Sequence, residues 1–231
     1  MIVVVGSPLF RPGSADLPSG AAGLAAGIAT AAAAAERTVQ LVGRIGEDPA
    51  GEATLLALAR DGIGHVASLR DPAHPTRAIA PATESDPDAI GDDPRSGAEL
   101  ATESDTESET GTSLGPIGSA TLDRGDLELA LRYLGTFSVV VVAEPLDPAA
   151  LAVVADAVAY NGATLVVIVP AGHADPALPA DAIAIEAPDD DPDGVFARTV
   201  GGFAAELDGG ADPATALASA VAAHGWERAQ R

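Results

Sequence analysis

LVGRIGEDPAGEATLLALARDGIG, residues 41–64, contains the most informative pattern in the chain. A short apolar run leads into a turn marked by glycines between Gly43 and Gly51. Leucines then recur at helical spacing, and two further glycines close the segment. Strand, tight turn and amphipathic helix in this order form the repeating unit of an α/β domain. The segment therefore predicts an α/β fold.

Three further apolar runs agree with this prediction. IVVV at residues 2–5, SVVVVA at 138–143 and ATLVVIV at 163–169 have no polar alternation. Continuous apolar strands are typical of a parallel sheet covered by helices on both faces. We expect a further short strand at 182–185. The sequence also predicts helices at 20–36, 127–134, 148–160, 194–207 and 212–224.

The ends and connections of these elements carry their own signals. Asp147 precedes a proline and is expected to cap the helix at 148–160, and Pro213 is expected at the first position of the last helix. Residues 10–19 are rich in Pro, Gly and Ser and predict a loop. Residues 65–80 combine short apolar positions with prolines, which is consistent with a small sheet or a lid piece.

The 231 residues, of which 47% are hydrophobic, are sufficient for one domain, 1–231, with a substantial core. Residues 81–113 are acidic and have almost no large apolar side chains, so we expect a disordered, solvated insertion there; a functional acidic tail is the alternative. There is no apolar run of membrane-spanning length, and the start at Met1 does not resemble a signal peptide. We therefore expect a soluble, cytoplasmic protein with no membrane partner.

The charge balance is extreme, with 34 acidic residues against 12 basic ones and a net charge of −22. Such a charge repels nucleic acid, which excludes nucleic-acid binding, and it repels itself unless salt screens it. We therefore hypothesise a halophilic protein from an acidic proteome, although a GC-rich genome would also explain why every basic residue is arginine. The four histidines have no metal-ligand spacing and there is no cysteine, so no metal site is predicted.

Two stretches resemble the ribokinase/PfkB family of carbohydrate kinases. In residues 22–64, the small and glycine residues from Ala22 to Gly46 follow that family's first signature in register, and GRIGEDPAGE is similar to its G-x-x-G-x-D-x-x-G motif. Gly27 stands where the family has an asparagine. In residues 191–207, DPDGVFARTVGGFAAEL is similar to the family's D-T-x-G-A-G-D-x-F-x-x-G segment.

This resemblance implies a ribokinase-like three-layer α/β/α fold with a mostly parallel central sheet and a reduced lid. It implies anion- or nucleotide-binding positions at Asp191, Asp193 and Gly194. Candidate positions on the substrate side are Asp16, Gly23 and Gly27. If the protein is active, the resemblance implies ATP and Mg²⁺ as cofactors and a sugar or nucleotide as ligand.

The chain departs from the family where the chemistry occurs. Val195 and Phe196 replace the Ala-Gly of the anion hole, and Ala197 stands at the position of the catalytic Asp. An alanine methyl group cannot take a proton from a sugar hydroxyl. The chain is also short, and a strand-helix unit that helps to build the nucleotide site is missing before Asp191. No catalytic residue is therefore predicted.

Three functions remain open from the sequence. The first is a degenerate kinase-fold protein that binds a ligand or regulates a partner, a pseudokinase. The second is an active sugar or nucleoside kinase whose Asp189, Asp190, Asp191 and Asp193 hold Mg²⁺; the simpler interpretation of these carboxylates is a solvated turn with an N-capping Asp. The third is a structural protein that forms a homodimer through an apolar face.

Overall fold

A five-stranded parallel sheet forms the centre of the molecule, as predicted. The structure is a computed structural model that describes residues 1–14, 18–79, 121–172 and 178–225. The strand order is β4-β1-β7-β8-β9, and every neighbouring pair is parallel. The strands are β1 (Ile2–Val5), β4 (Val39–Val42), β7 (Val139–Val142), β8 (Thr164–Val169) and β9 (Ile183–Glu186). The segment 81–113 and Asp16 lie outside the described residues.

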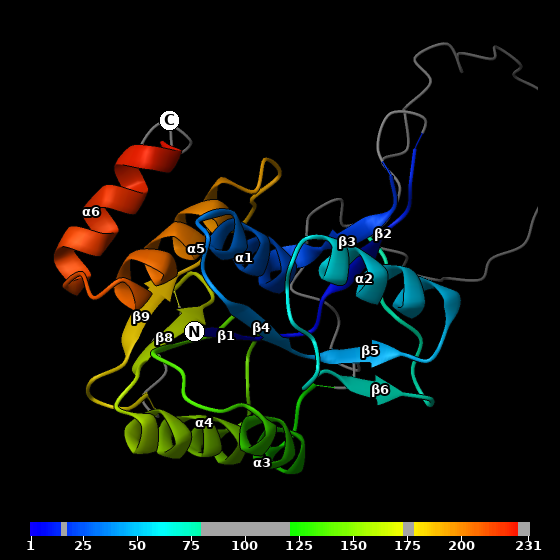
Figure 1. The fold of residues 1–231 in the computed structure, drawn as a ribbon, viewed down its shortest axis with the longest axis horizontal. Helices are drawn as coiled ribbons and strands as arrows, with labels where there is room; N and C mark the ends of the chain where they lie inside the picture. The colour runs from blue at the N-terminus through cyan, green and yellow to red at the C-terminus, as the bar shows by residue number, and fades with distance from the viewer. Residues whose placement is uncertain (15–17, 80–120, 173–177, 226–231) are drawn as a thin grey trace, which may run out of the picture.

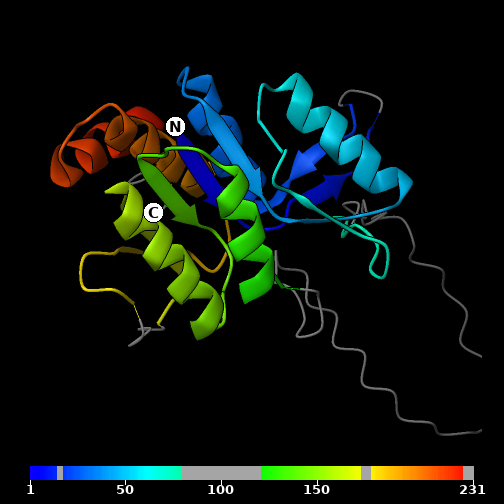
Figure 2. The ribbon, with the colours of Figure 1, turned by 60° about the horizontal axis from the view of Figure 1, so that its bottom comes forward.

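Helices cover both faces of this sheet (Figures 1 and 2). On one face lie α1 (Gly23–Ala34), α5 (Val195–Asp208) and α6 (Pro213–His224), and on the other lie α3 (Arg124–Tyr133) and α4 (Pro148–Asn161). Successive β1 side chains enter opposite cores: Ile2 and Val4 pack in the α1–α5 core, whereas Val3 and Val5 pack in the α3–α4 core. All four are fully buried, which explains the uninterrupted apolar run. The fold is a three-layer α/β/α sandwich.

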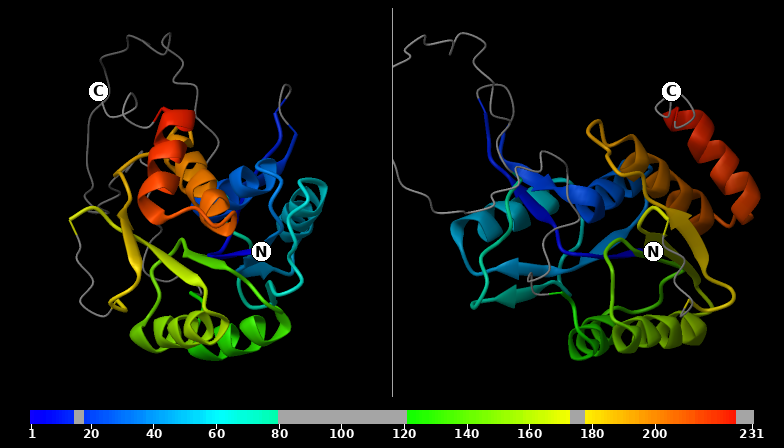
Figure 3. Two further views of the ribbon diagram at one scale, coloured as in Figure 1. Left: turned by 60° about the vertical axis from the view of Figure 1, so that its left-hand side comes forward. Right: turned by 180° about the vertical axis from the view of Figure 1, so that it is seen from behind.

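An outlying unit projects beyond the carboxyl ends of β1 and β4, and Figure 3 shows it from two further sides. It consists of an antiparallel pair, β2 (Leu9–Arg11) with β3 (Gly20–Ala22), a parallel pair, β5 (Arg44–Gly46) with β6 (Leu69–Asp71), and α2 (Pro49–Arg60). Helix α2 packs on β2, β3 and β5. The small sheet at 65–80 was predicted, and the structure places β6 there.

Three helices begin with the same Asp-Pro pair. Asp48, Asp147 and Asp212 each accept a hydrogen bond from the backbone N–H three residues later, and each is followed by a proline in the first turn. These contacts satisfy N–H groups that have no partner inside the helix. The predicted cap at Asp147 and the predicted position of Pro213 are therefore confirmed.

Two local predictions were wrong. Residues 10–19 were expected to be a loop and the first helix was expected to begin at Gly20, but Leu9–Arg11 pairs with Gly20–Ala22 and the helix begins at Gly23. The backbone of Gly20–Ala22 bonds to another strand, which outweighs the helical preference of its alanines. Gly23 then turns the chain with φ of 81°, a conformation that favours glycine.

Candidate functional site

The carboxyl ends of β1, β4 and β7 converge on one polar region. Ser7, Arg44 and Glu144 each lie two residues beyond the end of one of these strands. From β1 the chain continues to β4 on one side of it and later enters β7 on the other side. The order in which the chain adds strands to the sheet therefore reverses beside β1. Crevices outside the carboxyl ends of strands at such a point are the usual ligand sites of open α/β sheets. We call Ser7, Arg44 and Glu144 the strand-end site.

Glu144 is the unusual member of the strand-end site. Its Oε2 atom accepts the backbone N–H of Ser7 at 2.8 Å. Its Oε1 atom is buried and has no hydrogen-bond partner among the described residues. Burial raises the pKa of the Glu144 carboxyl, although the backbone N–H groups of Ser7 and Leu122 and the charge of Arg77 oppose this shift. A buried carboxyl oxygen without a partner is costly to a fold, and such groups are frequent at ligand sites.

Ser7 joins the loops after β1 and β4. Its Oγ accepts the backbone N–H of Arg44 at 3.1 Å. The two loops approach so closely that a Cβ atom on Gly43 would lie 2.6 Å from the carbonyl oxygen of Gly6. Only glycine fits at this position, which accounts for the glycine that ends the apolar run of β4.

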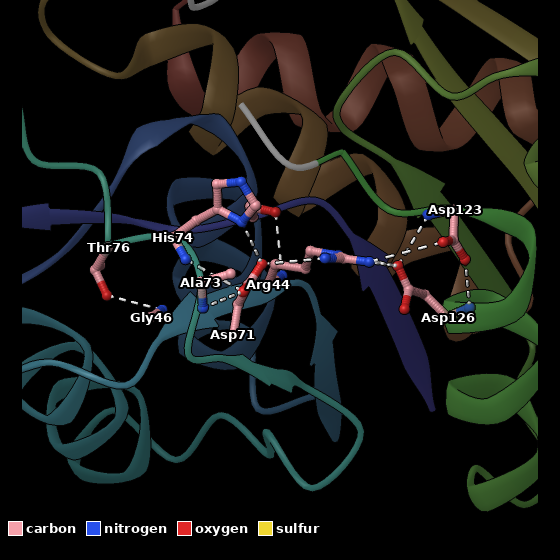
Figure 4. A network of polar contacts seen from close by, with 9 residues as sticks. Arg44, Gly46, Asp71, Ala73, His74, Thr76, Asp123 and Asp126 are labelled. Carbon is pink, nitrogen blue, oxygen red and sulfur yellow. Dashed lines mark hydrogen bonds and ion pairs between the residues drawn. The ribbon is translucent and has the colours of Figure 1, made fainter. Parts of the chain in front are cut away.

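Arg44 is the centre of an ionic cluster, drawn in Figure 4. Its Nη2 lies 2.6 Å from Oδ2 of Asp126 at the start of α3, and its Nη1 lies 3.1 Å from Oδ2 of Asp71 at the end of β6. The hydrogen bond with Asp126 is the largest effect that raises the pKa of Arg44. The cluster thus joins β5 and β6 of the outlying unit to α3, which lies in the α3–α4 layer of the sandwich.

Asp71 is held in this cluster as a carboxylate. Its Oδ1 accepts the N–H of Ala73 at 2.9 Å, and its Oδ2 lies 3.0 Å from Nδ1 of His74. The Ala73 N–H, followed by the contacts with His74 and Arg44, lowers the pKa of Asp71 to about 2. Because each charged group of the cluster has a partner within it, we interpret the cluster as a positioning element and not as an open binding site.

The N-terminus of α5 contains the positions that the resemblance assigned to anion binding. Gly194 caps this helix with φ of 63°. The carboxylate of Asp191 accepts the backbone N–H of Phe196 through Oδ1 and that of Ala197 through Oδ2, both at 3.0 Å. These are the N–H groups that a helix N-terminus would offer to a bound phosphate. A carboxylate of the chain itself therefore occupies this anion site.

The other candidate positions lie nearby, in packed surroundings. Gly27 of α1 faces Ala197 of α5, where a Cβ atom added to Gly27 would lie 2.8 Å from the Cβ of Ala197. Gly23 lies under β2, and an added Cβ atom there would lie 2.9 Å from Cγ of Leu9. The backbone carbonyl oxygen of Asp193 accepts a hydrogen bond from Nη1 of Arg198 at 2.7 Å.

The structure thus brings Asp191, Gly194, Gly27 and Ala197 together around the start of α5. Sequence reasoning missed Glu144 and the contact of Ser7 with it. The available signal was position: Glu144 closely follows the buried strand 138–143, where the carboxyl end of a parallel strand places polar residues at the ligand edge. Within the described ranges, no three His, Asp or Glu side chains are grouped to hold a metal ion. No helix of the described residues is long and apolar enough to span a membrane.

Comparisons of the sequence give no match, either to a protein-family model or to a curated protein. Solved structures do match. A protein called Sa239 aligns with a TM-score of 0.61 at 13% identity, over 94% of this chain and 89% of its own. Ribokinase from Arabidopsis thaliana, crystallised with ribose and ATP, aligns with a TM-score of 0.54 at 15% identity, over 96% and 90%.

Phosphofructokinase-2 from Escherichia coli, crystallised with fructose-6-phosphate, aligns with a TM-score of 0.54 at 11% identity, over 97% of this chain and 92% of its own. At such low identity these likenesses concern the course of the backbone and not the chemistry of the site. They agree with the parallel sheet order and the layered helices described above. The chain therefore has the three-layer fold of the ribokinase/PfkB sugar kinases.

Proposed function

We propose that the protein is a ribokinase-like pseudokinase that binds a small neutral polyol, such as a sugar, at the strand-end site and transfers no phosphoryl group. The observation that carries this proposal is the position of Asp191. Its carboxylate accepts the N–H groups of Phe196 and Ala197. A phosphoryl group at this helix end would displace the carboxylate or meet its negative charge at close range.

The packing of Ala197 supports the same conclusion. Its side chain is 5% exposed and lies against Gly27, so there is no space beside it for a substrate hydroxyl. The residues at this helix end therefore do not fit the phosphates of ATP, and we assign no step to ATP or Mg²⁺. The carboxylates at 189–193, which the kinase alternative would need, offer no grouped metal site among the described residues.

Glu144 supports ligand binding. A carboxylate accepts hydrogen bonds from hydroxyl groups. The Oε1 atom of Glu144 is buried without such a bond, so it can accept one from a ligand. A sugar hydroxyl would supply that donor at the edge where the fold class places its ligands.

The test is a titration of the purified full chain in molar KCl with a panel of sugars, and with ATP and Mg²⁺, followed by calorimetry and by ADP release. We expect heat of binding for at least one sugar and no ADP release. Glu144→Gln should weaken sugar binding by about tenfold or more, because the anionic acceptor is lost. Glu128→Gln, an exposed carboxyl of α3 paired with Arg124, is the matched control and should bind as the parent does.

Steady ADP release that Asp191→Ala abolishes would refute the proposal and establish the kinase alternative. Absence of binding to every sugar, with Glu144→Gln indistinguishable from the parent, would refute the assignment of the strand-end site.

A further inference from the structure

The two edges of the central sheet differ. At β4, the backbone of Gly64 runs alongside: Leu41 donates its N–H to the Gly64 carbonyl at 2.8 Å, and Gly64 donates to Val39 at 2.9 Å. This contact covers the β4 edge. At the other edge, β9 pairs with β8 and with no other strand of the described residues. An open edge strand invites pairing with another chain.

The backbone of β9 presents free groups on its outer side. Ala187 donates its N–H to the Val169 carbonyl of β8 at 2.8 Å. Because N–H groups alternate sides along a strand, those of Ala184 and Glu186 point away from β8. Proteins usually protect such an edge with charge. In β9 only Glu186 is charged, and its Oε1 is engaged with the N–H of Gly172.

Helix α6 leaves an apolar groove beside this edge. The helix packs on α5 beyond β9, at the end of the sheet (Figures 1 and 3). A hollow of about 50 Å³ separates it from β9. The side chains that line this hollow are almost entirely apolar: Ile185, Phe196, Thr199, Val200, Phe203, Leu217 and Val221. Leu217 lines this hollow together with Ile185 of β9 and is 44% exposed, so it is open to contact from a strand added beside β9.

We propose that a second copy of this chain occupies the position beside β9, so that two β9 strands pair antiparallel and the two sheets become one. A two-fold axis through Ala184 places each Ala184 opposite its counterpart, and the two residues exchange both N–H···O bonds. The Glu186 N–H then meets the carbonyl of Ala182, whose own N–H is already bonded to Pro179. The pairing thus uses the groups that are free.

Side chains also agree with this register. Ile183 lies opposite Ile185 of the second copy, on the face that carries the groove, where both are partly buried against the α1–α5 core. Glu186 lies opposite Ala182, so like charges do not meet directly across the axis. The strand is therefore complementary to itself, and its one carboxylate, Glu186, is already bonded to Gly172. For these reasons we choose a second copy over an unrelated peptide.

The test measures the mass of the full chain by light scattering in molar KCl. We expect twice the 22.8 kDa of one chain. Ala184→Pro removes an outward N–H without touching the ladder with β8, and it should give a monomer with unchanged circular dichroism. Ala184→Ser should remain a dimer. Leu217→Glu should dissociate the dimer, whereas Leu56→Glu, at a 71% exposed leucine of α2, should not.

Amide hydrogen exchange provides a measurement that does not depend on the folding of a variant. The N–H groups of Ala184 and Glu186 should become protected as protein concentration rises. A monomer at every concentration would refute the proposal. Protection of these N–H groups in a sample that light scattering shows to be monomeric would also refute it, since a segment of the same chain would then cover β9. Equal dissociation by Leu56→Glu and Leu217→Glu would show that charge, not this edge, controls association.

Discussion

Gly27 of α1 and Ala197 of α5 lie in such close contact that neither position can accept a larger side chain without displacing the other helix: a Cβ atom on Gly27 would lie 2.8 Å from that of Ala197. The same two helices approach again one turn further on, where a Cβ atom on Gly201 would lie 2.6 Å from the carbonyl oxygen of Ile28. Residues 27 and 197, the two positions singled out in the sequence motifs, thus belong to one packing arrangement.

The first prediction tests this contact with a double-mutant cycle. Gly27→Ala should destabilise the fold by about 1–3 kcal/mol through overpacking, in spite of the better helical propensity of alanine. Ala197→Gly should cost about 1 kcal/mol. The double variant should recover most of the first loss, because the methyl group is merely exchanged between the helices. Chemical denaturation measures all four proteins, and strictly additive losses would contradict the contact.

The second prediction concerns the cap of α5. Asp191→Ala leaves the N–H groups of Phe196 and Ala197 without their acceptor, so the free energy of unfolding should fall by about 1–2 kcal/mol. Asp191→Asn retains one acceptor oxygen and should lose less. Thermal unfolding in molar KCl gives the order of the three proteins. Asp156→Asn, an exposed residue of α4, is the control and should unfold like the parent.

The third prediction follows from the raised pKa of Glu144. A carboxyl whose folded pKa lies above its unfolded value, about 4.3, contributes stability that is full below the unfolded value. That contribution is lost as the pH rises through the folded pKa. Glu144→Gln lacks this loss, so it should be more stable than the parent at neutral pH and approach it below about pH 4. Unfolding temperatures measured across this pH range test the prediction. If the ionised Glu144 carboxylate stabilised the fold, Glu144→Gln would instead be less stable than the parent at neutral pH.

The fourth prediction concerns the opposite shift at Asp71, from 3.8 to about 2. A lowered pKa contributes stability above the unfolded value, and this stability disappears as the pH falls from about 4 to about 2. The parent should therefore lose stability across that window more steeply than Asp71→Asn. Acid titrations at fixed salt, with Asp156→Asn as the matched control, measure the difference. Parallel curves for the parent and Asp71→Asn would contradict the ionic role.

The fifth prediction tests the halophilic hypothesis through the net charge of −22. Salt shortens the range of repulsion between carboxylates to about 3 Å at 1 M, against about 30 Å at 0.01 M. The unfolding temperature should therefore rise strongly from millimolar to molar KCl. A neutral osmolyte of equal osmolality is the control, since it does not screen charge. A folded, monodisperse and equally stable protein in dilute buffer would refute the hypothesis.

The sequence predicted the parts of the fold that depend on local pattern. Apolar runs such as 138–143 identified the buried strands, and Asp-Pro pairs marked helix starts because one side chain caps one nearby turn. Local pattern also predicted that residue 197, an alanine, supplies no base, and this stays a prediction. Local pattern failed at Gly20–Ala22, where the pairing partner, Leu9–Arg11, lies a loop away.

The site could be predicted only in part, for the same reason. The Oε2 atom of Glu144 accepts the N–H of Ser7, which is 137 positions away in the chain. The engagement of Asp191 with the N–H groups of Phe196 and Ala197 is local by comparison, and the N-capping interpretation of the carboxylates at 189–193 agrees with it. Long-range contacts such as that between Ser7 and Glu144 determine whether a polar residue is free or satisfied, and a single sequence does not contain them.

The bonds of Arg44 have a consequence for the rate of ligand binding. They join Asp71 of the outlying unit to Asp126 of α3, so the segments beside Glu144, which we call the rim, are held in place before any ligand arrives. A fixed rim spares the ordering cost that a closing flap would impose, and it needs no conformational step before binding. We therefore expect ligands to enter and leave in single-exponential steps whose rates scale with concentration. Release of the rim by Arg44→Met would add a slower, concentration-independent phase.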